Sequence, residues 1–255
     1  MAAAYASNFI TFAGTEDMGS GLKASFKVEQ AMTFNATTLG TGNRESWVGL
    51  SGAFGDIKAG TQYTNIFFAV VPVDPNGFNN IAGWGPATAM GDASAINSND
   101  AITYTLPKLV DGLNISFQSF RPTSTSTASS AGLNYTVGAL SAAWANQTAG
   151  ADKTSAYGLS YNFGVAKVGF SNIDANIAGV KTTDNTYAVS APIGEAFSLA
   201  YSAGTYKKDT ASTKNSQLGA YYTLSKRTMA YVNFGTSTGA DTTTSVTAIG
   251  INHSF

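Results

Sequence analysis

The sequence of 255 residues contains no cysteine and only one histidine, His253. The absence of thiols excludes a disulfide scaffold and a thiolate metal site. No group of other side chains has the ligand spacing of a zinc centre, so we expect neither a metal nor a cofactor. A Ser-His hydrolase needs a histidine oriented by a carboxylate beside an exposed serine. One histidine next to the end of the sequence is a poor basis for that arrangement, and we expect no enzymatic activity.

Charged residues are also scarce, at 11% of the chain against about 25% in an average soluble domain. The net charge of −1 gives no indication of a nucleic-acid partner. Long apolar runs are missing as well. The longest, residues 67–71, ends at Pro72 and is far shorter than the ~18 residues of a membrane helix. Residues 1–4 lack the basic segment and apolar core of a signal peptide, so we expect none here.

What the chain does contain is a period of two. In residues 22–29, Leu22, Phe26 and Val28 alternate with Lys23 and Lys27. The same alternation of apolar and polar side chains recurs in residues 113–118, 157–163 and 197–202. Such a pattern is typical of strands with one apolar and one polar face.

Residues typical of turns separate these strands, and the connections they form alternate between short and long. Short connections are expected near residues 55–56, 110–112, 138, 164, 194 and 226–227. Longer polar stretches, interpreted as loops, lie between them at residues 35–43, 122–130, 148–153, 177–183, 207–214 and 235–244. Short turns that alternate with long loops are typical of an antiparallel meander with one periplasmic and one extracellular rim.

The number of strands decides the environment of the two faces. We count about fifteen strands, too many for side chains to fill the centre of a closed barrel. The polar face therefore suits a water-filled lumen, and the apolar face suits lipid. Closure also pairs the backbone groups, as a bilayer requires. We predict an all-β fold: one transmembrane, antiparallel, up-and-down β-barrel formed by residues 1–255.

One segment, residues 65–99, has no sustained alternation and is rich in Gly, Asn, Ala and Pro. A structureless segment of this length inside a compact domain is uncommon and is usually functional. We expect it to fold into the lumen and narrow it.

Four stretches, residues 14–24, 43–55, 109–113 and 224–255, resemble the Gram-negative porin family, the general diffusion porins of proteobacterial outer membranes. The resemblance implies an outer-membrane location, a homotrimer, contact with membrane lipid and lipopolysaccharide, and insertion by the barrel-assembly machinery. It also implies that the last strand carries the assembly signal, with Ile251, His253 and the terminal Phe255.

Family members begin with a strand before the one that starts here near Phe9. Bacterial single-chain barrels have an even number of strands. We therefore expect sixteen strands in the full protein, with the first absent from this sequence. The alternative is a smaller barrel in which residues 3–12 take its place.

Charged side chains in the lumen are the candidate site. By resemblance, Arg44 falls where the family places one arginine of a basic ladder that faces the inward loop, whereas Phe9 and Asn97 occupy positions that usually carry arginine. Lys23, Lys27 and Lys58 lie on polar faces and would partly replace the ladder, and Asp74 and Asp92 on the inward loop would supply opposing charge. The alternative for each is a solvated charge without a role. With so few charges, we expect weak ion selectivity.

Three functions fit these features. The first is passive diffusion of ions and small hydrophilic solutes through a trimeric porin. The second is a substrate-selective channel with a binding site on the inward loop, where Phe78 and Trp84 would stack on a sugar. The alternative for these two rings is that they pack the loop against the wall. The third is a structural or adhesive surface barrel without conductance.

Overall fold

The computed structural model describes residues 8–34, 39–71, 81, 88–90, 93, 96–123 and 126–255. The elements are listed here in chain order: Phe9–Gly19 (β1), Leu22–Phe34 (β2), Leu39–Gly52 (β3), Gly55–Tyr63 (β4), Asn65–Val70 (α1), Asn97–Thr105 (β5), Leu113–Thr123 (β6), Ser126–Val137 (β7), Leu140–Ala149 (β8), Asp152–Asn162 (β9), Lys167–Ile177 (β10), Val180–Ile193 (β11), Phe197–Lys208 (β12), Ala211–Ser225 (β13), Thr228–Thr238 (β14) and Thr243–His253 (β15). Residues 88–90 are also helical. No helix among the described residues is long and apolar enough to cross a membrane.

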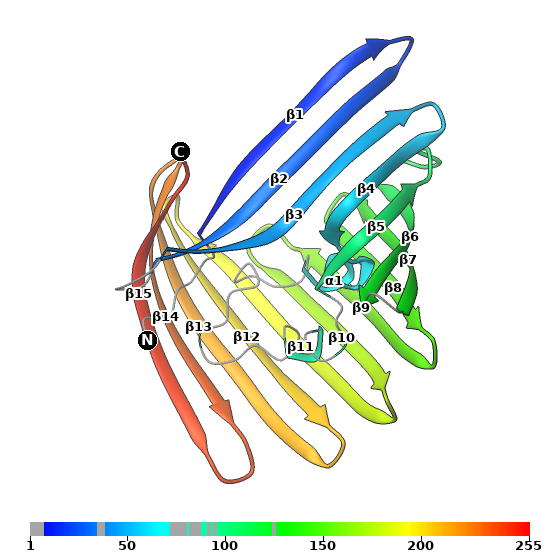
Figure 1. Cartoon of the computed structure of the whole chain (residues 1–255). Helices are drawn as coiled ribbons and strands as arrows, with labels where there is room; N and C mark the ends of the chain where they lie inside the picture. Colours follow the sequence, from blue (N-terminus) through cyan, green and yellow to red (C-terminus); the bar gives the residue numbers. More distant parts are fainter. Residues whose placement is uncertain are drawn as a thin grey trace.

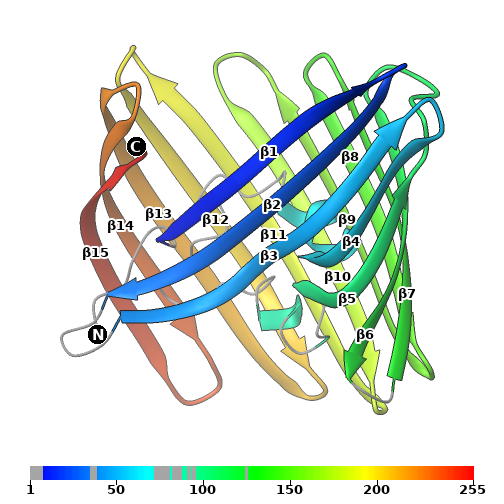
Figure 2. The ribbon, with the colours of Figure 1, turned by 45° about the horizontal axis from the view of Figure 1, so that its top comes forward.

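The fifteen strands make one antiparallel sheet in which each strand pairs with its neighbours in the sequence (Figure 1). The sheet curls around a central space, with β1–β3 facing β11–β13 across it (Figure 2). The prediction of an all-β, up-and-down meander of about fifteen strands is confirmed. Within the described residues, β1 and β15 remain the two edges of the sheet and do not pair with each other. A closed barrel of sixteen strands stays a prediction for the full protein.

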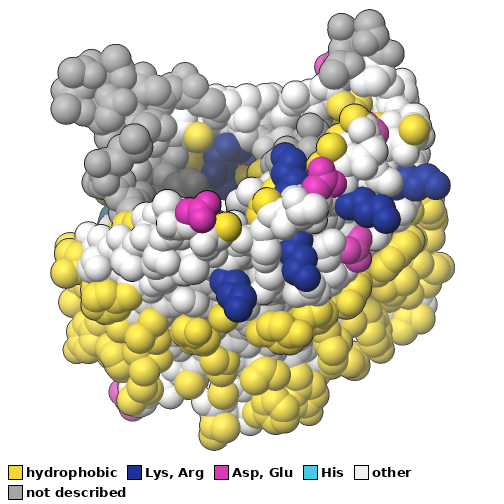
Figure 3. Space-filling model, turned by 90° about the horizontal axis from the view of Figure 1, so that it is seen from below, with side chains coloured by type: hydrophobic (Ala, Val, Ile, Leu, Met, Phe, Trp, Pro, Cys, Tyr) yellow, Lys and Arg dark blue, Asp and Glu magenta, His cyan; other side chains and the backbone are white. Residues whose placement is uncertain are grey.

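The two faces of the sheet separate by polarity as the alternation predicts. Large apolar side chains on the outer face are exposed: Phe26 is 45%, Leu159 49% and Ile249 80% exposed. On the concave face, Ser116 and Ser160 are buried. Hydrophobic side chains accordingly cover much of the outer wall in the space-filling view (Figure 3). This distribution is the reverse of that in a water-soluble barrel, whose apolar face packs inward.

Several stretches interpreted as loops are strand ends instead. β8 and β9, β10 and β11, and β12 and β13 are joined by tight two-residue hairpins, so the loop predictions for residues 148–153, 177–183 and 207–214 are wrong. In the β10–β11 hairpin, Ala178 and Gly179 both have positive φ (51° and 83°), the combination that a type I′ turn requires. The polar residues misled the interpretation because strands that extend past the apolar band are polar on both faces.

The helix α1 lies on the concave side of the sheet (Figure 1), where it packs against β7, β8 and β9. It begins directly after β4. The side chain of Thr64 caps it by accepting a hydrogen bond from the backbone N–H of Phe67 (3.1 Å). Within the segment of residues 65–99, α1 therefore covers Asn65–Val70 and β5 begins at Asn97.

Candidate pore-wall site

The concave side of β2 and β3 carries a β-bulge. Glu29 pairs with Glu45, but the next pair joins Gln30 to Asn43, so Arg44 is an extra residue in β3. In a regular strand, two consecutive side chains point to opposite faces. A bulge sets two residues opposite one and breaks this alternation. Arg44 and Glu45 therefore both reach the concave side, where each meets a side chain of β2.

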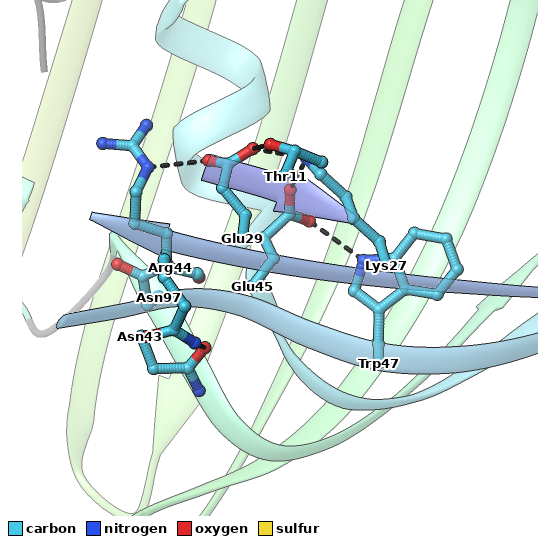
Figure 4. A network of polar contacts seen from close by, with 9 residues as sticks. Thr11, Lys27, Glu29, Asn43, Arg44, Glu45, Trp47 and Asn97 are labelled. Atoms are coloured by element: carbon cyan, nitrogen blue, oxygen red, sulfur yellow. Dashed lines mark hydrogen bonds and ion pairs between the residues drawn. The ribbon is translucent and has the colours of Figure 1, made fainter. Parts of the chain in front are cut away.

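The bulge assembles a network of ion pairs (Figure 4). Arg44 Nε lies 2.7 Å from Glu29 Oε1, and Lys27 Nζ lies 2.9 Å from Glu29 Oε2. Lys27 forms a second ion pair with Glu45. Thr11 on β1 donates a hydrogen bond to Glu29 Oε2 (3.1 Å). One carboxylate, that of Glu29, thus joins three strands.

The two carboxylates are shielded more than the cations. The side chains of Glu29 and Glu45 are 7% and 11% exposed, against 26% for Lys27 and 27% for Arg44. Trp47 also donates a hydrogen bond from its indole N–H to Glu45 Oε1 (3.1 Å). Each of these two shielded carboxylates accepts hydrogen bonds from several donors. These bonds fix the positions of the basic groups and also neutralise their charge.

Aromatic rings fix the position of the basic side chains further. The Arg44 guanidinium lies 5.0 Å from the ring centre of Phe9 and 5.8 Å from that of Tyr63. Both distances are typical of cation–π contacts. Asn97 donates a hydrogen bond to the backbone oxygen of Arg44 (2.8 Å). The two positions at which the resemblance implies missing arginines, Phe9 and Asn97, therefore both contact the arginine that remains.

Lys58 on β4 extends the wall. Its ammonium group lies 4.5 Å from the ring centre of Trp47 and 3.9 Å from Asp56 Oδ1. Three basic side chains on β2–β4 are thus matched by three carboxylates, and the wall is close to neutral: Lys27, Arg44, Lys58, Glu29, Glu45 and Asp56.

The three basic residues of this wall were predicted from the sequence, but its acids were not. Glu29 could have been found, because it shares the polar face of its strand with Lys27. Glu45 could also have been found, because the alternation that places Val48 and Leu50 on the outer face places Glu45 on the concave face. The bulge instead brings Arg44 to that face and leaves no recognisable signal in the sequence.

The other predicted residues lie elsewhere. Lys23 is exposed at the start of β2 and is not part of the network. Asp74 and Asp92 lie outside the described residues, as do Phe78 and Trp84. On β15, Ile251 is 68% exposed on the outer face, and His253 Nδ1 lies 2.8 Å from Thr228 Oγ1. The terminal Phe255 is fully exposed apart from its contact with the His253 ring.

A second part of the concave side is apolar. Ile66 and Val70 of α1 are fully buried in a cluster with small or branched residues of β8–β10: Ala143, Ala145, Ala156, Ile173 and Ala175. Tyr63 stacks on Phe67 with ring centres 4.1 Å apart, so the same helix also contacts the last residue of β4. Further along the segment, the backbone N–H of Ile81 donates a hydrogen bond to Gln217 on β13 (2.9 Å).

Polar contacts and a glycine fix the start of α1. Ser116 Oγ donates a hydrogen bond to Asn65 Oδ1 (2.7 Å). Gly132 on β7 lies directly beneath, where a β-carbon would come within 2.7 Å of Asn65 Cγ. The helix can approach β7 this closely only because residue 132 has no side chain.

Comparison with known proteins places this architecture in a family. The family model described as Gram-negative porin matches residues 3–242. The major outer membrane protein P.IB of Neisseria gonorrhoeae is 50% identical over 52 residues, a stretch that covers 20% of this chain and only 15% of that protein.

Two solved structures show the same fold. The anion-selective porin of Comamonas acidovorans superposes with a TM-score of 0.82 at 24% identity, covering all of this chain and 91% of that one. The outer-membrane protein OmpT of Vibrio cholerae, in its trimer form, superposes with a TM-score of 0.71 at 13% identity, covering 96% and 88%. With its meander of fifteen strands and a family match over nearly its whole length, the chain belongs to the Gram-negative porins.

Proposed function

We propose that the chain forms a water-filled channel in the outer membrane, through which ions and small hydrophilic solutes diffuse passively without a catalysed reaction. The observation that carries this proposal is the inverted polarity of the sheet, apolar outside and polar on the concave side. A barrel of about sixteen strands is wide enough for an aqueous lumen, and the family match supports the same function.

The narrow part of this channel is proposed to lie between the charged wall of β2–β4 and the segment of residues 65–99. The helix α1 begins at the end of β4 and is attached to β8–β10, so the segment starts at one wall and docks on another. A solute that passes between them meets Lys27, Arg44 and Lys58 together with their carboxylates. Because these charges are paired within the wall, their field is short-ranged, and the channel should discriminate weakly between anions and cations.

The chain is further proposed to assemble as a homotrimer in contact with membrane lipid and lipopolysaccharide, after insertion by the barrel-assembly machinery. The trimer form of the OmpT structure supports the trimer. The outward Ile251 and the exposed Phe255 at the edge of the sheet would be accessible to an insertion partner. The end of the barrel with the long β4–β5 connection is assigned to the cell exterior, because outer-membrane barrels have short periplasmic turns and longer extracellular loops.

Conductance in a planar bilayer tests the proposal. The purified protein should give stepwise, ohmic conductance that rises in proportion to the salt concentration, with a small reversal potential in a salt gradient. A barrel that inserts but conducts nothing would contradict the channel. Conductance that is blocked in a saturable way by one sugar, and not by others, would favour a substrate-selective channel instead.

A further inference from the structure

The outer wall of β11–β14 contains a groove of about 670 Å³ near the hairpin ends of these strands. The strand register arranges the outward side chains in rows across the wall. Apolar residues form one such row, in which neighbouring strands contribute Val189, Tyr201, Leu218 and Phe234. Two rows toward the hairpins, the residues become polar and basic: Asn185, Thr205, Lys214 and Thr238. The groove lies at this border.

The lining of the groove is rich in hydrogen-bond donors. It contains two lysines, Lys207 on β12 and Lys214 on β13, and several outward hydroxyl or amide side chains: Asn185, Tyr187, Thr205, Ser216, Thr236 and Thr238. No Asp or Glu is among the described residues that line it. Both lysines are exposed, and neither forms an ion pair with a described residue. This differs from the concave wall, where Lys27, Arg44 and Lys58 each face a carboxylate.

The two lysines lie close enough to share one anion. Lys207 pairs with Ser212 across the β12–β13 ladder, and Lys214 lies two residues further along β13. Diagonal neighbours of this kind are about 7–8 Å apart on one face of a sheet. Two flexible ammonium groups at that separation can both reach the oxygens of one phosphate. Among the outward strand residues in register with the lining, the nearest acid is Asp174 on β10, opposite Thr183 and one strand beyond the lining. Asp209, in the β12–β13 turn two residues from Lys207, accepts a hydrogen bond from the backbone N–H of Lys181 (3.3 Å).

The height of the groove on the wall indicates what faces it. Along β12, ten residues separate Phe197, in the lowest apolar row, from Lys207. This is a rise of about 33 Å along the strand, or about 25 Å along the barrel axis for strands tilted by about 40°. The apolar band of outer-membrane barrels is about 25 Å tall. The lysines therefore lie at the level of the lipid headgroups and not among the acyl chains.

We propose that this groove binds the phosphorylated headgroup of an anionic outer-leaflet lipid, with Lys207 and Lys214 as its phosphate ligands. The inference rests on the proposed function, because it requires the outer face of β11–β14 to meet lipid. The acyl chains of the same molecule would then extend down the apolar rows below the groove, which continue through Leu199 and Ile249. A free phosphate ion lacks this second contact, so a lipid is the occupant that fits both parts of the surface.

Native mass spectrometry of the intact, detergent-solubilised protein tests the site. The probes are diphosphorylated lipid A, the same lipid without phosphate, and inorganic phosphate alone. Lys207→Ala/Lys214→Ala should reduce the affinity for diphosphorylated lipid A by more than tenfold, because each basic residue near a charged lipid surface contributes about fivefold. Lys226→Ala, in the turn between β13 and β14 at the opposite end of the barrel, is the matched control and should bind as the unmodified chain does.

Three outcomes overturn the site: equal binding by the double variant and the unmodified chain, equal binding of lipid with and without phosphate, or binding of inorganic phosphate as tight as that of the lipid. Circular dichroism of the double variant checks that it retains its strands, and Lys207→Gln/Lys214→Gln provides a second variant of similar size. Conductance in a planar bilayer distinguishes failure of the lipid site from failure of the proposed channel. Loss of lipid binding with unchanged conductance leaves the channel intact, whereas absence of conductance in the unmodified chain contradicts the channel.

Discussion

Two parts of the concave side of the sheet differ in their side chains: one is charged and the other is apolar. The wall formed by β2–β4 carries three basic and three acidic side chains that pair with one another. The wall formed by β8–β10 carries alanines and Ile173, which pack on the apolar face of α1. Both walls belong to the same face of the same sheet.

The difference shows that the inner face of such a sheet need not be uniformly polar. Alanine leaves room for a helix and gives it an apolar surface to bury, whereas a larger polar residue would keep water between helix and wall. Among the described residues, charges gather on β2–β4, whereas α1 packs on β7–β10. An inward segment and a charged wall are therefore complementary parts of one arrangement, and each can be disrupted separately.

Weakening the contact between α1 and the apolar wall should have the largest effect on conductance. Ile66→Ala removes a fully buried side chain from the α1 cluster and should weaken the docking of the helix by about 2–4 kcal/mol. We expect larger and noisier single-channel conductance, because a loosened segment leaves the narrow part of the channel. Phe68→Ala is the control: Phe68 belongs to the same helix but is 45% exposed. If both variants behave alike, the apolar cluster does not hold the segment.

Unbalancing the charged wall should change selectivity without a large change in conductance. Glu29→Gln removes the carboxylate shared by Lys27 and Arg44, so the reversal potential in a salt gradient should shift toward anions. Arg44→Gln should shift it toward cations. Both shifts should be a fraction of the limit of about 59 mV for a tenfold gradient, and should shrink near 1 M salt, where the Debye length is about 3 Å. Shifts of the same sign in both variants would exclude these residues from the ion path.

A smaller effect is expected from crowding the start of α1. Gly132→Ala places a β-carbon too close to Asn65 and should displace the helix slightly, with a modest rise in conductance. Asn65→Ala in the same chain removes two of the three crowding atoms, Cγ and Oδ1, and should restore part of the original conductance. A double variant that is no closer to the unmodified chain than Gly132→Ala would show that the contact is not the cause.

The smallest effect is expected at Lys23, which has the same charge as Lys27 but lies outside the network. Lys23→Gln should leave the reversal potential almost unchanged under conditions in which Lys27→Gln shifts it measurably. Equal shifts in the two variants would mean that long-range charge, and not the paired wall, determines the preference.

The period of two predicted the strands and their faces, because it reports directly on which side of a sheet each residue lies. It failed where a strand becomes polar on both faces, as in the hairpin of β12 and β13. It also failed at the bulge, which brings Arg44 to the same face as its neighbour Glu45 without changing the composition around it. The location of Arg44 in the lumen was predicted only from the family resemblance. The alanines of β8–β10 did not predict the helix that packs on them.

The shared carboxylate of Glu29 also bears on how such a channel changes over generations. A wall whose charges cancel is one substitution away from either sign. Replacement of a glutamate codon by a lysine codon needs a single base change and alters the local charge by two. A single mutational step can therefore give this near-neutral wall an ion preference. A pore built from a long row of like charges would need several such steps to reach the same point.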